Sequence, residues 1–391
     1  MIGASMSAFD KFERHLLGPA REGSSRFAYL NSSARPEAMA VRAQIDQMLV
    51  RYPDQHRDAL TARIRSVSDV HHGGAVFELA LHEALLRSGC RILSVEPDLP
   101  DRARSPDFHA ETPDGSAFYV EATQAIGETP ADAGARTRLE DVLRALDKLV
   151  SPDFFLDVST DGRPSRPVRT RRLQERVVEW LAGLNHEKIK ASWDVNPAEM
   201  VALVIEEHGL TLTIKPIPRN DRGQQIGGAI GLQMMEPYVG RPGDGIREAV
   251  DGKARRYGDL RAPYIVAVNA MAEFQGEEDA IDALLGSPTL VIRRDADGGL
   301  TERWDRERNG VWVGERGPRN RGVSAVLSFD RLSAWTLENR QGRLIRNPWA
   351  RQALPNIPLG LTEFNPADGK LVRTEGSPLG HLLGLPNGWP G

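Results

Sequence analysis

The sequence is poor in cysteine and in long apolar runs. Its single cysteine, Cys90, excludes an intramolecular disulfide. The longest apolar stretches, MVALVI and PYIVAVNAMA, fall well short of the roughly 20 residues that cross a bilayer. The first residues, MIGASMSAFDKFERHLL, lack the apolar segment of a secretory signal. These absences predict a cytoplasmic protein that is not embedded in a membrane.

An excess of positive charge is also missing. The net charge is −4, so binding to a polyanion must depend on local clusters of cations. The chain has 391 residues, of which 40% are hydrophobic and 27% charged. This composition is typical of a globular protein with one large or two moderate domains.

The first third of the sequence predicts helices followed by strands. Apolar residues at helical spacing predict two surface helices between residues 36 and 66, interrupted near Pro53. A turn-like HHGG then precedes the helix AVFELALHEALLRSG, which Gly89 caps. CRILSVEP, SPDFHAET and AFYVEAT have strand composition, and a PDG turn separates the last two.

The alternation of helices and strands continues to about residue 269. RTRLEDVLRALDKLV and RRLQERVVEWLAGL predict helices, and MVALVIEE and LTLTIKPIP predict paired strands. GIREAVDGKARRYG predicts a helix with a C-terminal glycine, followed by the buried strand PYIVAVN. Short strand-like pieces with glycine turns follow, up to a poorly patterned segment, NPWARQALPNIPLG. We predict a helical segment over 1–70, an α/β core with an insertion over 71–275, and a β-rich extension over 276–391.

Two acidic residues occupy positions where a charge is costly. In FYVEAT, Phe118, Val120 and Ala122 share one face of the strand, and Glu121 and Thr123 share the other. If SPDF and FYVEAT pair across the PDG turn, Asp107 comes close to Glu121. Two neighbouring carboxylates repel unless a cation lies between them, and Mg²⁺ is typically bound by one or two carboxylates together with water and phosphate. We therefore predict a Mg²⁺ site, for which Mn²⁺ can substitute.

A third acid is a candidate for the same site. Glu78 lies beside the apolar stripe of the preceding helix. Glu83, on the same helix, is an alternative candidate for this third acid. Pro106 restricts Ser105 to extended conformations and so directs Asp107.

This order of elements and acids resembles the PD-(D/E)XK, or restriction-endonuclease-like, nuclease superfamily. Its core consists of a helix, a three-stranded meander, a second helix and a fourth strand. The resemblance implies that Glu78, Asp107 and Glu121 are the acids that bind metal. Thr123 departs from the family pattern, because it stands where the superfamily usually has a lysine.

In some members of the superfamily the following helix supplies that lysine. Here Lys253 is the candidate, and we expect Tyr257 one turn later on the same helical face. The resemblance implies a Mg²⁺-dependent DNA endonuclease in restriction, phage defence or repair, acting as a homodimer or with a defence-system partner. The cationic stretches at 169–176, 253–256 and 316–322 are candidate contacts for the phosphate backbone.

Two alternatives remain open at the level of sequence. Without the usual lysine, the chain can be an inactive nuclease-fold protein that binds nucleic acid or a partner. The acids can also belong to an unrelated α/β protein, in which Asp107 begins a turn and Glu78 and Glu121 face solvent. DNA and RNA are not distinguished as substrates.

Overall fold

The computed structural model describes most of the chain, and contacts divide it into two compact units. Described are residues 7–20, 24–99, 104–125, 130–196, 200–219, 228–235, 243–258, 260–272, 276–294, 300–367 and 370–391. Unit 1 comprises Met1–Gly127 and Arg241–Gly391, and unit 2 comprises Glu128–Gly240. Unit 2 is thus inserted within the sequence of unit 1. Among the described residues, no helix has both the length and the apolar character needed to cross a membrane.

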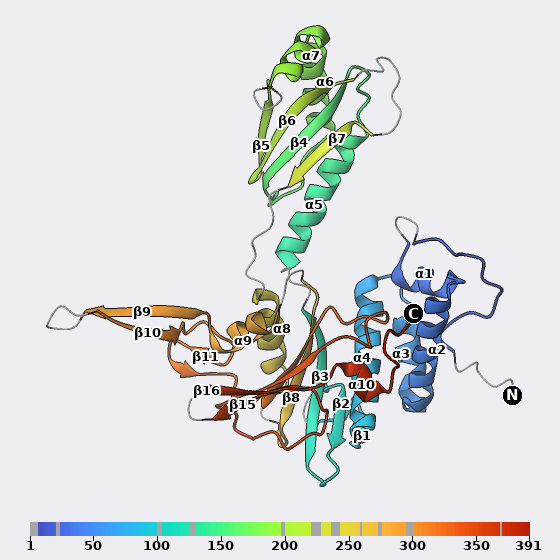
Figure 1. Cartoon of the computed structure of the whole chain (residues 1–391), viewed down its shortest axis with the longest axis vertical. Coiled ribbons are helices and arrows are strands. Elements are labelled where there is room, and N and C mark those ends of the chain that lie inside the picture. The colour runs from blue at the N-terminus through green and yellow to red at the C-terminus, as the bar shows by residue number, and fades with distance from the viewer. Residues whose placement is uncertain are drawn as a thin grey trace. The chain divides into compact units, whose positions relative to one another are not determined.

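Unit 1 contains one large sheet with helices on both faces (Figure 1). Its helices are α1 (Arg26–Ser32), α2 (Pro36–Arg51), α3 (Asp54–Ile64), α4 (Asp69–Arg87), α8 (Asp244–Ala254), α9 (Glu277–Leu285) and α10 (Leu379–Leu383). The strands of the sheet are β1 (Arg91–Val95), β2 (Phe108–Glu111), β3 (Ala117–Ala125), β8 (Tyr264–Ala270), β13 (Ala325–Asp330), β14 (Gly342–Arg346), β15 (Thr362–Ala367) and β16 (Lys370–Thr374). The chain is therefore a mixed α/β protein, which confirms the general α/β class predicted from the sequence.

The strands of this sheet run in the order β1-β2-β3-β8-β13-β14-β15-β16. β1, β2 and β3 form an antiparallel meander, and β8 pairs with β3 in parallel after the α8 crossover. The domain divisions predicted at residues 70 and 275 were placed at changes in sequence pattern. In the structure, β8 before residue 275 and β13 after it are neighbouring strands of this one sheet.

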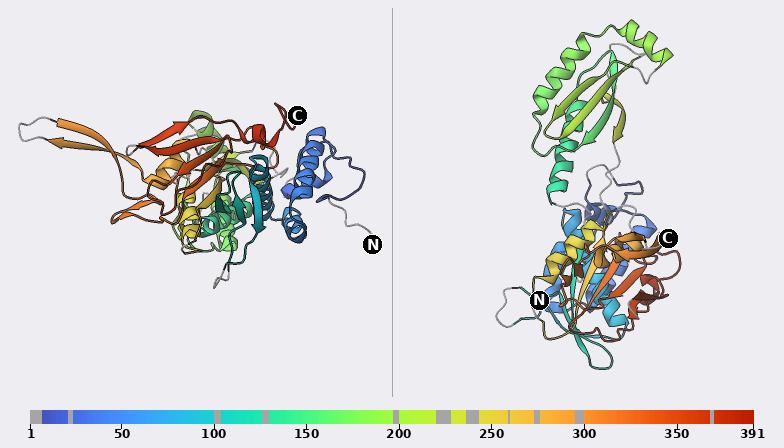
Figure 2. Two further views of the ribbon diagram at one scale, coloured as in Figure 1. Left: turned by 90° about the horizontal axis from the view of Figure 1, so that it is seen from below. Right: turned by 90° about the vertical axis from the view of Figure 1, so that its left-hand side faces the viewer.

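Each face of the sheet carries its own core. Phe118 and Val120 pack with α4 on one face, whereas Tyr264 and Val266 pack with α8 and α9 on the other. The alternation predicted for FYVEAT is thus confirmed. Two short pairs lie outside the sheet, β9 (Pro288–Arg294) with β10 (Leu300–Arg306) and β11 (Val313–Gly314) with β12 (Gly317–Pro318). β9 and β10 form a ribbon that extends away from the rest of unit 1 (Figure 2).

Unit 2 is a four-stranded sheet with helices packed on one core. Its elements are α5 (Pro130–Asp147), β4 (Phe154–Gly162), α6 (Thr170–Ala182), α7 (His186–Val195), β5 (Leu203–Glu207), β6 (Leu210–Pro218) and β7 (Ile230–Met235). The strand order is β5-β6-β4-β7. Alternate residues of β4, beginning with Phe154 and Leu156, face the apolar sides of the three helices. Unit 2 thus has an apolar core of its own.

Two local predictions need correction. HHGG is not a turn but lies within α4, which begins at Asp69 and is capped by Ser68. A Cβ at Gly73 would lie 2.8 Å from the side-chain amide of Gln124, so Gly73 of α4 lies directly against this side chain of β3. Tyr257 is not on the helix of Lys253, because α8 ends at Ala254.

Candidate active site

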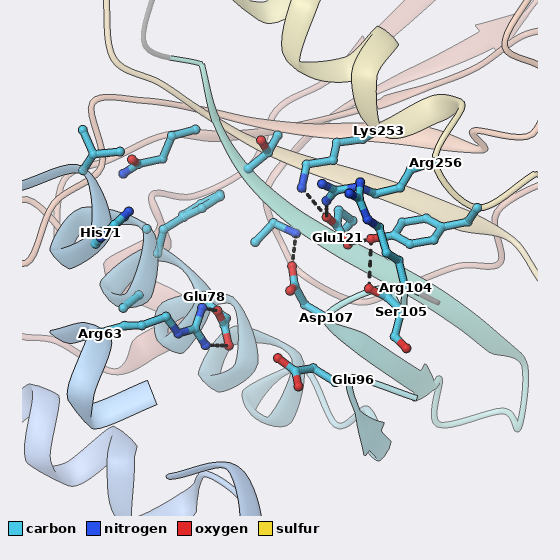
Figure 3. A pocket seen from close by; sticks show the side chains of 18 of the residues that line it. Arg63, His71, Glu78, Glu96, Arg104, Ser105, Asp107, Glu121, Lys253 and Arg256 are labelled. Atoms are coloured by element: carbon cyan, nitrogen blue, oxygen red, sulfur yellow. Dashed lines mark hydrogen bonds and ion pairs between the residues drawn. The ribbon is translucent and has the colours of Figure 1, made fainter. Parts of the chain in front are cut away.

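A cavity of about 710 Å³ opens in unit 1 between α4, the β1–β2–β3 meander and the end of α8. All six residues that the sequence singled out as site candidates line it: Glu78, Asp107, Glu121, Thr123, Lys253 and Tyr257. Glu83 does not line this cavity. It is fully buried and paired with Arg51 and Arg87 instead. Figure 3 shows Asp107 between Glu78 on α4 and Glu121 on β3.

The start of β2 positions Asp107. The Glu96 N–H donates to the Asp107 carbonyl at 2.9 Å, and Glu96 adopts a left-handed backbone conformation (φ 46°) at the end of β1. The Asp107 side chain crosses to β3, where its Oδ2 accepts a hydrogen bond of 2.6 Å from the Ala122 N–H. No hydrogen bond from a described residue reaches the other oxygen, Oδ1.

Asp107 experiences an unfavourable electrostatic environment. Burial raises the pKa of its carboxyl well above the usual range, and the charges of Glu121 and Glu78 raise it further. The Ala122 N–H and Lys253 act in the opposite direction and do not compensate. A cation bound beside Asp107 would relieve this repulsion.

Glu121 is buried, with 2% of its surface exposed, and three side chains contact it. Lys253 pairs with Oε1, and Arg256 donates to the same oxygen at 3.3 Å. The Tyr257 hydroxyl donates to Oε2 at 2.6 Å and also lies 2.9 Å from the Ser105 carbonyl oxygen. Burial and the charge of Glu121 raise the pKa of Tyr257, which keeps this hydroxyl protonated. The three partners follow Glu121 by 132 to 136 residues in the sequence.

Glu78 lies on the opposite wall, with 4% of its surface exposed. Arg63 from α3 donates to both of its oxygens, at 2.6 and 2.9 Å, and the Tyr52 hydroxyl donates at 2.7 Å. Both oxygens are therefore already engaged. Arg63 and Tyr52 were not identified from the sequence, because only the packing of α2 and α3 against α4 brings them to Glu78.

The donor set around Asp107 suits a hard divalent cation held by two carboxylates. Mg²⁺ commonly uses one or two carboxylates and completes its octahedral shell with water and phosphate oxygens. Asp107 and Glu121 supply such a pair: Glu121 is buried, Asp107 is half-buried, and both line the cavity. Within the described parts of the chain, no group of three or more His, Cys, Asp or Glu side chains is arranged to hold a metal.

Comparisons with known proteins found no relative of this chain. No family model matches the chain, and neither a curated protein nor a solved structure matches it.

Proposed function

We propose that this chain is a Mg²⁺-dependent deoxyribonuclease that hydrolyses phosphodiester bonds within DNA. The observation that carries the proposal is the meeting of Asp107, Glu121 and Lys253 in one cavity, from three separate segments of the chain. Paired carboxylates can hold the metal ion of phosphodiester hydrolysis, and an adjacent lysine can stabilise the charge that develops on the phosphate. The order α4, β1, β2, β3, α8, β8 also agrees with the core of the PD-(D/E)XK superfamily.

Each residue has a role that follows from its position. Asp107 and Glu121 would hold the ion, and Tyr257 keeps the Glu121 carboxylate oriented through Oε2. A bound Mg²⁺ supplies an acidified water and neutralises charge on the phosphate. Lys253, released from Glu121, donates to a phosphate oxygen, and the Thr123 hydroxyl on the same wall orients a water or a substrate oxygen. Glu78 contributes negative potential from the facing wall.

Cleavage of supercoiled plasmid in Mg²⁺, Mn²⁺ or EDTA tests this proposal. We expect nicking in either metal and none in EDTA, and a loss of at least about 100-fold in rate for Asp107→Asn and for Glu121→Gln. Glu111→Gln is the matched control, because Glu111 lies on the same hairpin but outside the cavity and pairs with Arg91. Cleavage by Asp107→Asn at the rate of the unmodified protein would overturn the assignment.

Metal binding provides a second readout that does not depend on finding the right substrate. Titration calorimetry with Mn²⁺ should detect binding to the unmodified chain and to Glu111→Gln, but not to Asp107→Asn. Equal Mn²⁺ binding by all three proteins would count against the two-carboxylate site even if no plasmid is cut.

A second candidate is an inactive nuclease-fold protein that binds nucleic acid or a partner. The observation that favours it is that Lys253 and Arg256 both form ion pairs with Glu121 and offset its charge. DNA binding in EDTA, together with absent cleavage and absent Mn²⁺ binding, would select this candidate.

A further inference from the structure

Unit 2 contains a local excess of positive charge in a chain whose net charge is negative. Between residues 163 and 176 the sequence has six arginines and one acidic residue, Glu175. Its first half leads into α6 and its second half forms the start of that helix, whose buried side is formed by Leu173, Val177 and Leu181. The charged residues of α6 are therefore distributed around its remaining surface.

Beside α6 lies a hollow of about 400 Å³, bounded by α5 and the first turns of α6. The charged and polar side chains that line it are Arg138, Asp141, Arg144, Lys148, Thr170 and Gln174. Two hydrogen bonds hold its walls together. Gln174 Nε2 donates to the Ala145 carbonyl at 2.7 Å, and Arg138 Nε donates to the Pro164 carbonyl at 2.7 Å.

Three cations and one carboxylate line the hollow, so its net charge is positive. The carboxylate, Asp141, pairs with Arg144 at 2.9 Å, and both side chains are more than half exposed. An exposed pair of this kind contributes little free energy, so an anion of higher charge can compete for Arg144. Lys148 is also exposed.

Helix geometry decides which arginines of α6 adjoin the hollow. Thr170 and Gln174 line it and stand one turn apart, so they mark the side of the helix that faces it. Arg171 lies next to this side and has 92% of its side chain exposed; it pairs with Glu175 at 3.2 Å, and this pair is also exposed and therefore weak. Arg172 and Arg176, also exposed, project from the opposite side of the helix.

We infer that Arg138, Arg144, Lys148 and Arg171, the basic face of unit 2, bind the phosphate backbone of DNA. This inference rests on the proposed function for the choice of DNA as the polyanion. No aromatic side chain is among the described residues that line the hollow, so stacking on bases is not provided there. Contacts to phosphates alone carry no sequence information, and binding by this face is therefore independent of base sequence.

Binding of a short labelled DNA duplex in EDTA, followed by fluorescence anisotropy, tests the inference. The full chain carries Asp107→Asn throughout, so that no probe is cut. In the hollow variant, Arg144→Gln/Lys148→Gln, we expect the dissociation constant to rise roughly 10-fold or more near physiological salt. The slope of log K against log salt should become shallower by about 2, at about 0.9 per phosphate contact.

The matched control is Arg172→Gln/Arg176→Gln. It removes the same charge from the same unit but from the side of α6 away from the hollow, and it should bind like the parent protein. If both variants bound DNA equally more weakly than the parent, the site would be overturned, because the loss of net charge would then explain the effect. Absent binding of duplex DNA by the parent, or tighter binding of RNA of the same sequence, would overturn the assignment of DNA.

Cleavage separates this inference from the proposed function. With an active site intact, the hollow variant should require more DNA for half-maximal cleavage and should keep the rate at saturating DNA. Salt-dependent binding without any cleavage would reject the nuclease and retain the basic face. Cleavage that the hollow variant performs at unchanged DNA concentrations would reject the basic face and retain the nuclease.

Discussion

The two walls of the cavity each hold a buried glutamate, and the two glutamates are bound in different ways. Glu78 receives two hydrogen bonds from the planar guanidinium of Arg63 and one from Tyr52. Glu121 receives a tyrosine hydroxyl on one oxygen, and an ammonium and a guanidinium together on the other. The residue types are similar, but the geometries are not.

This difference indicates different roles. A bidentate pair with arginine satisfies a carboxylate and fixes its orientation, which suits a structural contact. Lysine acts as a point charge on a flexible stem, so the pair between Lys253 and Glu121 can open when a cation competes for the carboxylate. We therefore expect the Glu78 wall to stabilise the fold and the Glu121 wall to carry the chemistry.

Removal of the Lys253 ammonium should separate chemistry from metal binding. We expect Lys253→Gln to lower plasmid cleavage by about 100-fold, the loss typical of one electrostatic donor at a reacting centre. Its Mn²⁺ affinity should be equal to that of the parent or higher, because a competitor for Glu121 is gone. Cleavage assays and calorimetry on one preparation measure both.

Arg255→Gln is the control for this variant. Arg255 follows α8 directly, pairs with Asp251 and does not line the cavity. If Lys253→Gln cleaves as fast as Arg255→Gln, the lysine has no part in the chemistry.

Removal of the Glu78 charge should affect stability more than removal of the Glu121 charge. Glu78→Gln breaks the two-pronged contact with Arg63, and we expect a loss of about 2 kcal/mol in the free energy of unfolding. For Glu121→Gln we expect less than about 1 kcal/mol, because the lost pair is offset by relief of the repulsion on Asp107. Urea denaturation in EDTA measures both. The reverse order would contradict the division of roles between the walls.

The stability of the protein should also depend on pH through His82, a residue of α4 close to the Glu78 wall. This residue is buried against Tyr52, with ring centroids 4.7 Å apart, and burial lowers its pKa to about 4. In the unfolded chain the pKa of His82 is near 6.5. Between about pH 6.5 and pH 4 the unfolded chain therefore binds a proton at His82 and the folded chain does not, so stability falls as the pH drops below about 6.5. Between pH 7 and pH 5.5 we expect a loss of about 1 kcal/mol that His82→Phe lacks.

Urea denaturation at the two pH values measures this difference. His72 is also buried with a lowered pKa, but it contributes equally to both proteins and cancels. His15→Gln, at an exposed histidine, should behave like the parent. An identical pH dependence in His82→Phe would show that His82 is not responsible.

Several elements were predictable from the sequence because their signals are local. The apolar spacing of α2 and α3, the break at Pro53 and the glycine after α4 all act within a few residues. The hairpin of β2 and β3 is defined by PDG, where Gly115 takes a positive φ of 87°. The strands β14, β15 and β16 were not predicted, although β14 pairs with the preceding strand β13 and β15 pairs with the following strand β16; the pairing of β14 with β15 is parallel and has no tight turn.

The α/β alternation, the two faces of FYVEAT and the closeness of Asp107 to a central acid could be predicted from the sequence, because strand pairing across a tight turn depends on nearby residues. Which charges meet depends on the packing of elements that are distant in the sequence. Arg63 holds Glu78, and Lys253 holds Glu121 across 132 residues of sequence. Such pairs form because helices and strands bury their apolar sides, and that packing fixes where the ends of long charged side chains can reach.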